Sequence, residues 1–190
     1  MNTREANFQL KQLVDEFGSA FQTISEASRT ALMTSLKGGD MIPVPDKLYG
    51  NEYRAQFTAR CDEIRGAVAA VINEQIDNIK ATMAEAPSAD AVNTVQMLAL
   101  RDDITADEID IVLGKYGDNY QAAKAIISVA ASKGLRGWSC TVEKQLADLE
   151  ALLSTMRRTM TATSAENGHA SSGYLEMLKI QIDLALPATA

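Results

Sequence analysis

The chain has 190 residues, 46% of them hydrophobic, and its 18 Lys and Arg residues stand against 25 Asp and Glu residues, a net charge of −7. This length supplies enough apolar residues for one core or two small ones. The acidic excess offers no phosphate-neutralising surface, which argues against nucleic-acid binding as the main activity.

The sequence also argues against a membrane protein, a secreted protein and a protein held together by disulfides or zinc. No apolar run approaches the roughly 20 residues that a membrane helix needs. The N-terminus lacks the basic-then-apolar layout of a secretory signal, so we expect a protein that begins near Met1 and stays in the cytoplasm. Cys61 and Cys140 form no CxxC motif, so we expect buried thiols rather than a disulfide framework or a zinc site.

The first predicted helix runs from about Thr3 to Leu36. Its apolar residues alternate at spacings of four and three, and Ser28 fills the one polar position of that heptad stripe. The stripe consists of Leu10, Val14, Phe17, Phe21, Ile24 and Ala31. Two glycines and then two prolines follow, which cannot continue a helix, so residues 37–47 are predicted to be a linker.

The second predicted helix runs from about Asp46 to Met83. Three consecutive spacings of four between Ile64 and Ile76 follow an eleven-residue repeat, so a strict left-handed supercoil is interrupted here. Its stripe consists of Phe57, Cys61, Ile64, Val68, Ile72, Ile76, Ile79 and Met83. Joined by one linker, the two helices most simply fold back on each other, so residues 1–86 are predicted to form a long antiparallel, coiled-coil-like hairpin.

Residues 87–137 are predicted to form a compact module of three short helices. The first spans about 89–100. The second begins with a capping box, in which Thr105 and Glu108 cap each other's backbone, and with a hydrophobic staple of Ile104 on Ile109. It should end at Gly117, a residue type that tolerates a left-handed cap.

The third helix of the module should start at Asp118, with Gln121 three residues later, and end at Gly134. We expect Trp138, just beyond the module, to anchor it against the last long helix; an exposed binding tryptophan is the rival interpretation. Together with Tyr116 and Tyr120, Trp138 forms the candidate docking face of the module.

Residues 138–190 are predicted to hold a long heptad helix from about Cys140 to Ala162, a mobile loop at 161–173 and a C-terminal helix. The spacing of the long helix indicates a self-association seam formed by Val142, Leu146, Leu149, Leu153, Met156 and Met160. The loop is small, polar and aperiodic. From Tyr174 to Leu186 a helical face and a strand-like alternation both fit, and the lack of any partner strand favours the helix.

No catalytic, cofactor or metal site is predicted. An acidic cluster at Asp102, Asp103, Asp107, Glu108 and Asp110 lacks the spacing of a calcium loop and fits the first turn of a helix. His169, the single histidine, lies in the polar segment and has no orienting acid or nucleophile beside it. Carboxylate catalysis from Asp62, Glu63 and Glu74, or from the acidic cluster, is the least favoured hypothesis.

Two resemblances arise from residues Ile104–Ile126 and from the whole chain. The helix, glycine turn and polar-rich helix with paired alanines resemble ubiquitin-associated-type three-helix modules, which recognise protein surfaces, although the turn reads Lys115-Tyr116-Gly117. The whole chain resembles the small, acidic, uncharacterised helical proteins encoded among virion genes of tailed phages and prophages of Gram-positive bacteria. This second resemblance implies a structural or assembly role, in the host cytoplasm or the virion.

The sequence therefore predicts an all-α, non-enzymatic interaction protein. Its expected partners are further copies of itself and other virion or assembly proteins, without a membrane and without nucleic acid. The alternative function is a helical bundle that holds a small ligand in a methionine-lined pocket, for which Met97, Met156, Met160 and Met177 are the candidates.

Overall fold

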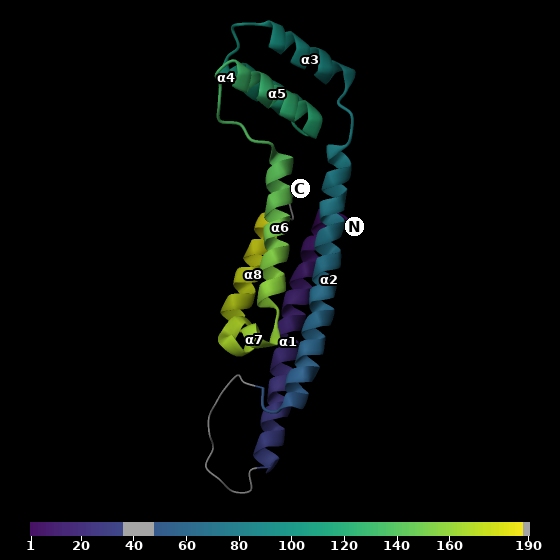
Figure 1. Ribbon diagram of the computed structural model, residues 1–190, viewed down its shortest axis with the longest axis vertical. Coiled ribbons are helices and arrows are strands. Elements are labelled where there is room, and N and C mark those ends of the chain that lie inside the picture. The colour runs from purple at the N-terminus through teal and green to yellow at the C-terminus, as the bar shows by residue number, and fades with distance from the viewer. Residues whose placement is uncertain (36–47, 188–190) are drawn as a thin grey trace. The chain divides into compact units, whose positions relative to one another are not determined.

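The computed structural model describes residues 1–35 and 48–187, and this part of the chain is helical without a strand (Figure 1). The all-α prediction is confirmed. The helices are α1 (Thr3–Ser35), α2 (Asn51–Met83), α3 (Ala89–Leu100), α4 (Ala106–Tyr116), α5 (Tyr120–Ser132), α6 (Thr141–Thr159), α7 (Ala162–Ser164), the π-helix η1 (Ala165–His169) and α8 (Ser172–Ala185).

These helices belong to two compact units. The long-helix unit comprises Met1–Gln75 and Asp148–Ala190, and the short-helix unit comprises Ile76–Ala147. The boundaries between the units therefore fall inside α2 and α6, whereas the sequence places its domain boundaries at residues 86–87 and 137–138.

In the long-helix unit, α1 and α2 run in opposite directions. The N-terminal ammonium group lies 2.6 Å from the carboxylate of Glu74, and Ser28, late in α1, exchanges hydrogen bonds of 2.6 and 3.0 Å with the backbone of Tyr49, just before α2. Between these ends the ring of Phe57 lies 5.8 Å from that of Phe17. The contact of Ser28 explains the polar position in the first heptad stripe. Coiled-coil packing of the pair stays a prediction.

Helix α8 packs against α1 at close range. Gly18 faces Leu175, and a Cβ atom at position 18 would overlap the Leu175 side chain. The amide of Asn7, a buried polar residue, donates to the carboxylate of Asp183 (2.9 Å) and to the carbonyl of Leu186 (2.6 Å). Glycine at position 18 thus leaves room for the end of the Leu175 side chain.

The segment 161–173, predicted to be a mobile loop, is mostly helical. It forms α7, η1 and the start of α8, and the chain kinks within η1, where Asn167 and the left-handed Gly168 (φ 94°) are not helical. The prediction failed because small residues carry the burial here: Ala162, Ala165 and Ala170 are buried. The strand alternative for the C-terminal segment is wrong as well, since Tyr174–Leu186 lies in α8 and its cap.

The core of the short-helix unit is small. Leu98, Ile109, Ile126 and Ala130 are buried, and half-buried side chains, including Ile104 and Trp138, pack around them. The capping box of Thr105 and Glu108 is present as predicted.

Two details of this unit correct the sequence analysis. Asn119, not Asp118, caps α5. Gly117 is right-handed (φ −66°), and a Cβ atom there would overlap the Leu113 carbonyl, so glycine serves close packing rather than a left-handed cap.

Two predicted boundaries also shift. Helix α2 starts at Asn51 rather than at Asp46, and α6 ends at Thr159 rather than at Ala162. The predicted linker 37–47 and Leu36 lie outside the described residues.

Candidate interaction surfaces

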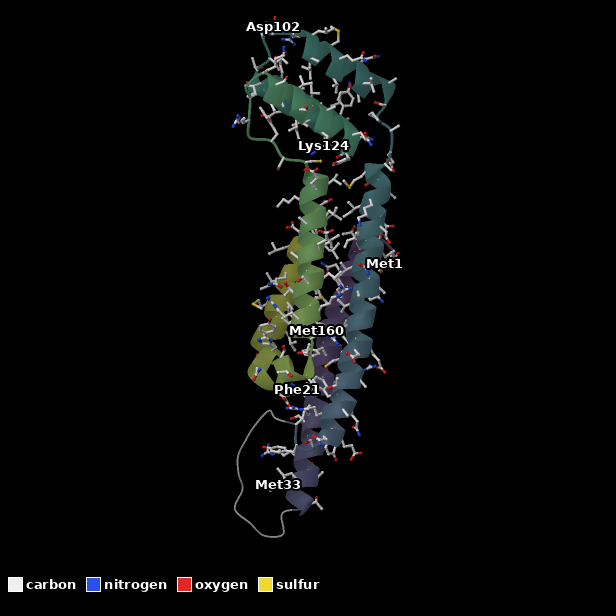
Figure 2. All side chains as sticks on the ribbon, in the orientation of Figure 1. Met1, Phe21, Met33, Asp102, Lys124 and Met160 are labelled. Carbon is white, nitrogen blue, oxygen red and sulfur yellow. The ribbon has the colours of Figure 1, made fainter. Side chains whose placement is uncertain are left out.

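The residues predicted as a self-association seam on α6 are largely covered by the chain itself. Leu149, Leu153, Met156 and Met160 are buried, while Val142 and Leu146 are half-buried. Met160 lies just beyond the last residue of α6, and Figure 2 shows it labelled there. The heptad spacing of α6 thus builds the core of the monomer, and a second copy is not needed to cover these four side chains.

The predicted docking face is half-buried and tied into the short-helix unit. Tyr116 donates its hydroxyl hydrogen bond to Asp90, and Tyr120 donates to Glu143 at 3.1 Å. The indole N–H of Trp138 donates to Asp110 at 2.6 Å. These three aromatic residues therefore hold helices of the unit together, and their polar atoms already have partners.

A different set of apolar side chains is exposed, on α8. Met177, Ile180 and Leu184 point away from the buried face of the helix, and Ile180 and Leu184 are 60% and 75% exposed. Met177, Ile180 and Leu184 lie in line along the helix at spacings of three and four, and we call them the α8 outer row. Sequence reasoning missed this row, because it weighed one helical face against a strand-like alternation and did not consider a second apolar face of the helix. The helical face was Tyr174, Leu178, Ile182 and Leu186.

Helix α8 is therefore apolar on two opposite faces. Its inner face contributes Leu175, Leu178, Ile182 and Ala185 to the core. The apolar residues of the two faces follow each other along the sequence, which produces the strand-like alternation.

Ion pairs border the α8 outer row on the side of α1. Lys11 lies 2.6 Å from Asp183, and Lys179 lies 2.7 Å from Asp15 and 2.9 Å from Glu176. The hydrogen bond from Lys11, followed by that from Asn7, lowers the pKa of Asp183 below its ordinary value. The Lys11 contact also brings the end of α1 that carries Phe8, an exposed aromatic residue, next to the end of α8 that carries Leu184.

Two grooves lie within the units. One, of about 470 Å³, runs between α1 and α2 and is lined mostly by polar and small side chains, with the ion pairs of Arg60 to Glu16 and Glu63 beside it. The other, of about 270 Å³, lies between α3 and α4. Its lining is Thr94, Met97, Leu98, Arg101, Glu108, Ile111 and Val112.

The acidic residues singled out in the sequence stabilise the folded chain locally. Glu108 accepts hydrogen bonds from Arg101 (2.7 Å) and from the backbone N–H of Thr105 (3.0 Å). The bond from Arg101, and then that from Thr105, lower the pKa of Glu108. Asp62 pairs with Arg65 on the next turn of α2. Among the described residues, no group of three His, Cys, Asp or Glu side chains could hold a metal ion.

Cys61 and His169 also serve the packing of the fold, as does Glu166 near His169. Burial raises the pKa of the Cys61 thiol to about 11, so the thiol is protonated at neutral pH. His169 stacks on Tyr174 with ring centres 4.2 Å apart. Glu166 pairs with Arg54 at 2.5 Å.

The methionines proposed for a ligand pocket divide between core and surface. Met156 and Met160 are fully buried, whereas Met97 and Met177 are exposed. Met97 lies in the short-helix unit and the other three in the long-helix unit.

Comparison with known proteins adds no relative. No protein-family model, no curated protein and no solved structure matches this chain. Among the described helices, none combines the length and the apolarity that a membrane crossing requires.

Proposed function

We propose that this protein is a non-enzymatic structural protein that self-associates, and that a second copy covers the α8 outer row. The observation that carries the proposal is the second apolar face of α8, where Ile180 and Leu184 are exposed opposite a fully packed inner face. A contiguous exposed apolar surface of this kind marks an interaction site.

The size of the surface fits a dimer of ordinary affinity. At about 150–200 Å² for each large side chain, Met177, Ile180, Leu184 and Phe8 together expose roughly 400 Å² of apolar surface. Apolar atoms make up a little over half of a typical interface, so the α8 outer row together with Phe8 of α1 corresponds to about 700 Å² for each partner. Stable complexes bury about 800 Å² for each partner.

The pattern of the row favours a second copy of this chain as the partner. A line at heptad spacing is complementary to another such line. Because Ile180 is the middle residue of the row, two copies related by a twofold axis overlap along its whole length when the two Ile180 side chains meet. The ion pairs of Lys11 and Lys179 neutralise most of the charge beside the row, which reduces repulsion between like copies.

The groups that could perform chemistry support a structural role. Glu108 serves a helix start, Asp62 and Glu63 pair with arginines of α2, and burial keeps the Cys61 thiol protonated. With the resemblance to phage and prophage proteins, these roles favour a component of a virion or of its assembly.

Sedimentation equilibrium of the wild-type protein and of two variants tests the proposal. We expect the wild type at about 100 μM to have a mass near twice the 20.5 kDa of one chain. Ile180→Glu places a charge at the centre of the row and should shift the protein to the monomer, with the dissociation constant raised at least about a hundredfold. A monomeric wild type would overturn the proposal.

Met33→Glu is the matched control. Met33 is an exposed methionine near the end of α1, where Figure 2 labels it, and it lies outside the α8 outer row. This variant should sediment as the wild type does, and both variants should keep the helical circular dichroism of the wild type. If Met33→Glu dissociates the protein as strongly as Ile180→Glu, the contact is not at α8.

A further inference from the structure

A second apolar surface lies in the short-helix unit, at the α3–α4 groove. Met97 and Ile111 are 62% and 70% exposed on its two sides, and Leu100 stands exposed one turn beyond Met97. The groove volume of about 270 Å³ is below the roughly 300–1,000 Å³ of sites that enclose a small molecule. It fits one or two side chains inserted from a helix that lies across it.

The floor of the groove is fixed by the core of the unit. Leu98 is buried in the core cluster, and Val112 packs against that cluster. The capping box holds the start of α4, and the side chain of Ser88 caps α3 by accepting from the backbone of Ala91 at 3.1 Å. The groove is therefore preformed, so a partner does not have to order it on binding.

The rim of the groove is acidic. Arg101 is its only lining cation, and Arg101 is already paired with Glu108 (2.7 Å) and with Asp103 (3.7 Å). Asp107 is exposed one turn before Ile111 on α4. Two carboxylates therefore pair with one guanidinium group, and Asp107 adds a further negative charge. Lys115, one turn after Ile111, is paired with Asp90 at 3.0 Å, so the net charge beside the apolar strip is negative.

We propose that the α3–α4 groove docks an amphipathic helix of a partner protein whose apolar row is bordered by Lys or Arg residues. The apolar side chains of that helix would enter between Met97 and Ile111, and its cations would lie near Asp103 and Asp107. Methionine suits such a contact, because its flexible side chain adapts to different partner surfaces.

Charge argues against a second copy of this chain as the occupant. The exposed apolar helix that the chain itself offers is α8, and Glu176 and Asp183 border its outer row. These carboxylates are paired with Lys11 and Lys179, so α8 offers no net positive charge to the acidic rim of the groove. The groove therefore complements a basic partner, and this inference does not depend on the self-association proposed above.

Fluorescence anisotropy with the full-length protein tests the inference. The probe is a labelled 18-residue helical peptide with leucines on one face and lysines beside them, and a second peptide has glutamates in place of the lysines. We expect the lysine peptide to bind at least about tenfold more tightly than the glutamate peptide, with an affinity that falls as salt is raised from 50 to 500 mM. Equal binding of both peptides would overturn the inference.

Variants then locate the binding. Ile111→Ser should weaken binding of the lysine peptide about tenfold, because it removes an apolar contact. Ile111 is already exposed, so a serine there should not disturb the fold. The double variant D103N/D107N should weaken it about three- to tenfold. The double variant E26Q/E150Q removes the same charge at exposed sites of the long-helix unit and should bind as the wild type does.

Two outcomes would contradict this location. If E26Q/E150Q weakens binding as much as D103N/D107N, the peptide responds only to net charge. If Ile111→Ser binds as the wild type does, the groove is not the site. Ile180→Glu should bind normally, so that a failure of self-association and a failure of the groove give different results.

Discussion

The two units of this protein are stabilised in different ways. In the long-helix unit, α1 and α2 bury continuous stripes of large side chains, from Leu10 to Phe21 on one helix and from Phe57 to Ile72 on the other. In the short-helix unit the central cluster holds only three large buried side chains, Leu98, Ile109 and Ile126, with small residues around them. Three helices of this unit begin with side-chain caps, at Ser88, Thr105 and Asn119.

This difference follows from helix length. In a helix of 33 residues such as α1, most backbone N–H and C=O groups form hydrogen bonds within the helix. Such a helix also gains stability along a whole packed face. Helices of 11 to 13 residues, such as α4 and α5, leave a larger share of their backbone groups at the ends, so caps matter more. We expect packing substitutions to dominate in one unit and cap substitutions to be visible in the other.

The largest expected effect is loss of an aromatic side chain from the long-helix core. Phe57 is fully buried, and its ring lies 5.2 Å from that of Phe21. Phe57→Ala should lower the free energy of unfolding by about 3–5 kcal/mol, through lost burial and a cavity. Denaturant unfolding measures the loss. Hydrogen exchange should rise in α1 and in residues 51–75 of α2 and stay unchanged in α4; a uniform rise would mean that the units unfold together.

A smaller effect is expected where α1 meets α8. Gly18→Ala should cost about 1 kcal/mol net, because the new methyl group forces the end of the Leu175 side chain to move and this strain outweighs the gain in helix propensity. Gly66, within α2, has open space around its Cβ position, so Gly66→Ala should stabilise by about 0.5–1 kcal/mol. Thermal unfolding should show a lower melting temperature for Gly18→Ala and a higher one for Gly66→Ala. A stabilising Gly18→Ala would show that the helices have room to separate.

The cap prediction belongs to the short-helix unit. Thr105→Ala removes the acceptor for the Glu108 backbone N–H and should cost about 1 kcal/mol, with exchange rising at the start of α4. Ser171 precedes α8 without a side-chain cap hydrogen bond, so Ser171→Ala should change the free energy of unfolding by less than about 0.5 kcal/mol. If Thr105→Ala and Ser171→Ala lower the free energy of unfolding equally, the contrast between the units is contradicted.

The smallest effect is a response to acid. The pKa values of Asp90, Glu108 and Glu143 are lowered in the folded short-helix unit, first by hydrogen bonds from Tyr116, Arg101 and Lys124 respectively. A carboxyl whose pKa is lower when folded stabilises the fold above its unfolded pKa, and that contribution disappears as the pH falls below about 4.

Fluorescence of the single tryptophan, Trp138, reports on this unit alone. In a denaturant titration at pH 3, the Trp138 signal should change at a lower denaturant concentration than at pH 6. Asp90 and Glu143 are exposed and Glu108 is half-buried, so the shift should be small and should shrink in high salt. A Trp138 signal that changes at a higher denaturant concentration at pH 3 than at pH 6 would contradict the predicted direction.

Much of the fold could be predicted from the sequence because periodicity and caps are local signals. The heptad stripes gave the long helices, and the pattern of Thr105 and Glu108 located the start of α4. The segment 161–173 was missed because alanines, rather than large apolar residues, are buried there.

The interaction surfaces could not be predicted, because periodicity does not distinguish a face buried in the monomer from a face left exposed. The row from Leu149 to Met160 has the clearest heptad spacing, yet the monomer covers it. On α8, Leu178 and Ile182 point inward while Ile180 and Leu184 point outward, and only the packing against α1 separates the two sets.

Disulfide trapping at the centre of the α8 outer row tests the central claim most directly. Both native cysteines are buried, so Ile180→Cys adds the one exposed thiol in the described part of the chain. If two copies meet at Ile180, mild oxidation should convert most of this variant to a disulfide-linked dimer, because the two Cβ atoms come within the roughly 4 Å that a disulfide needs. Met33→Cys should stay largely monomeric. An Ile180→Cys protein that remains monomeric, or that crosslinks no faster than Met33→Cys, would contradict self-association through α8.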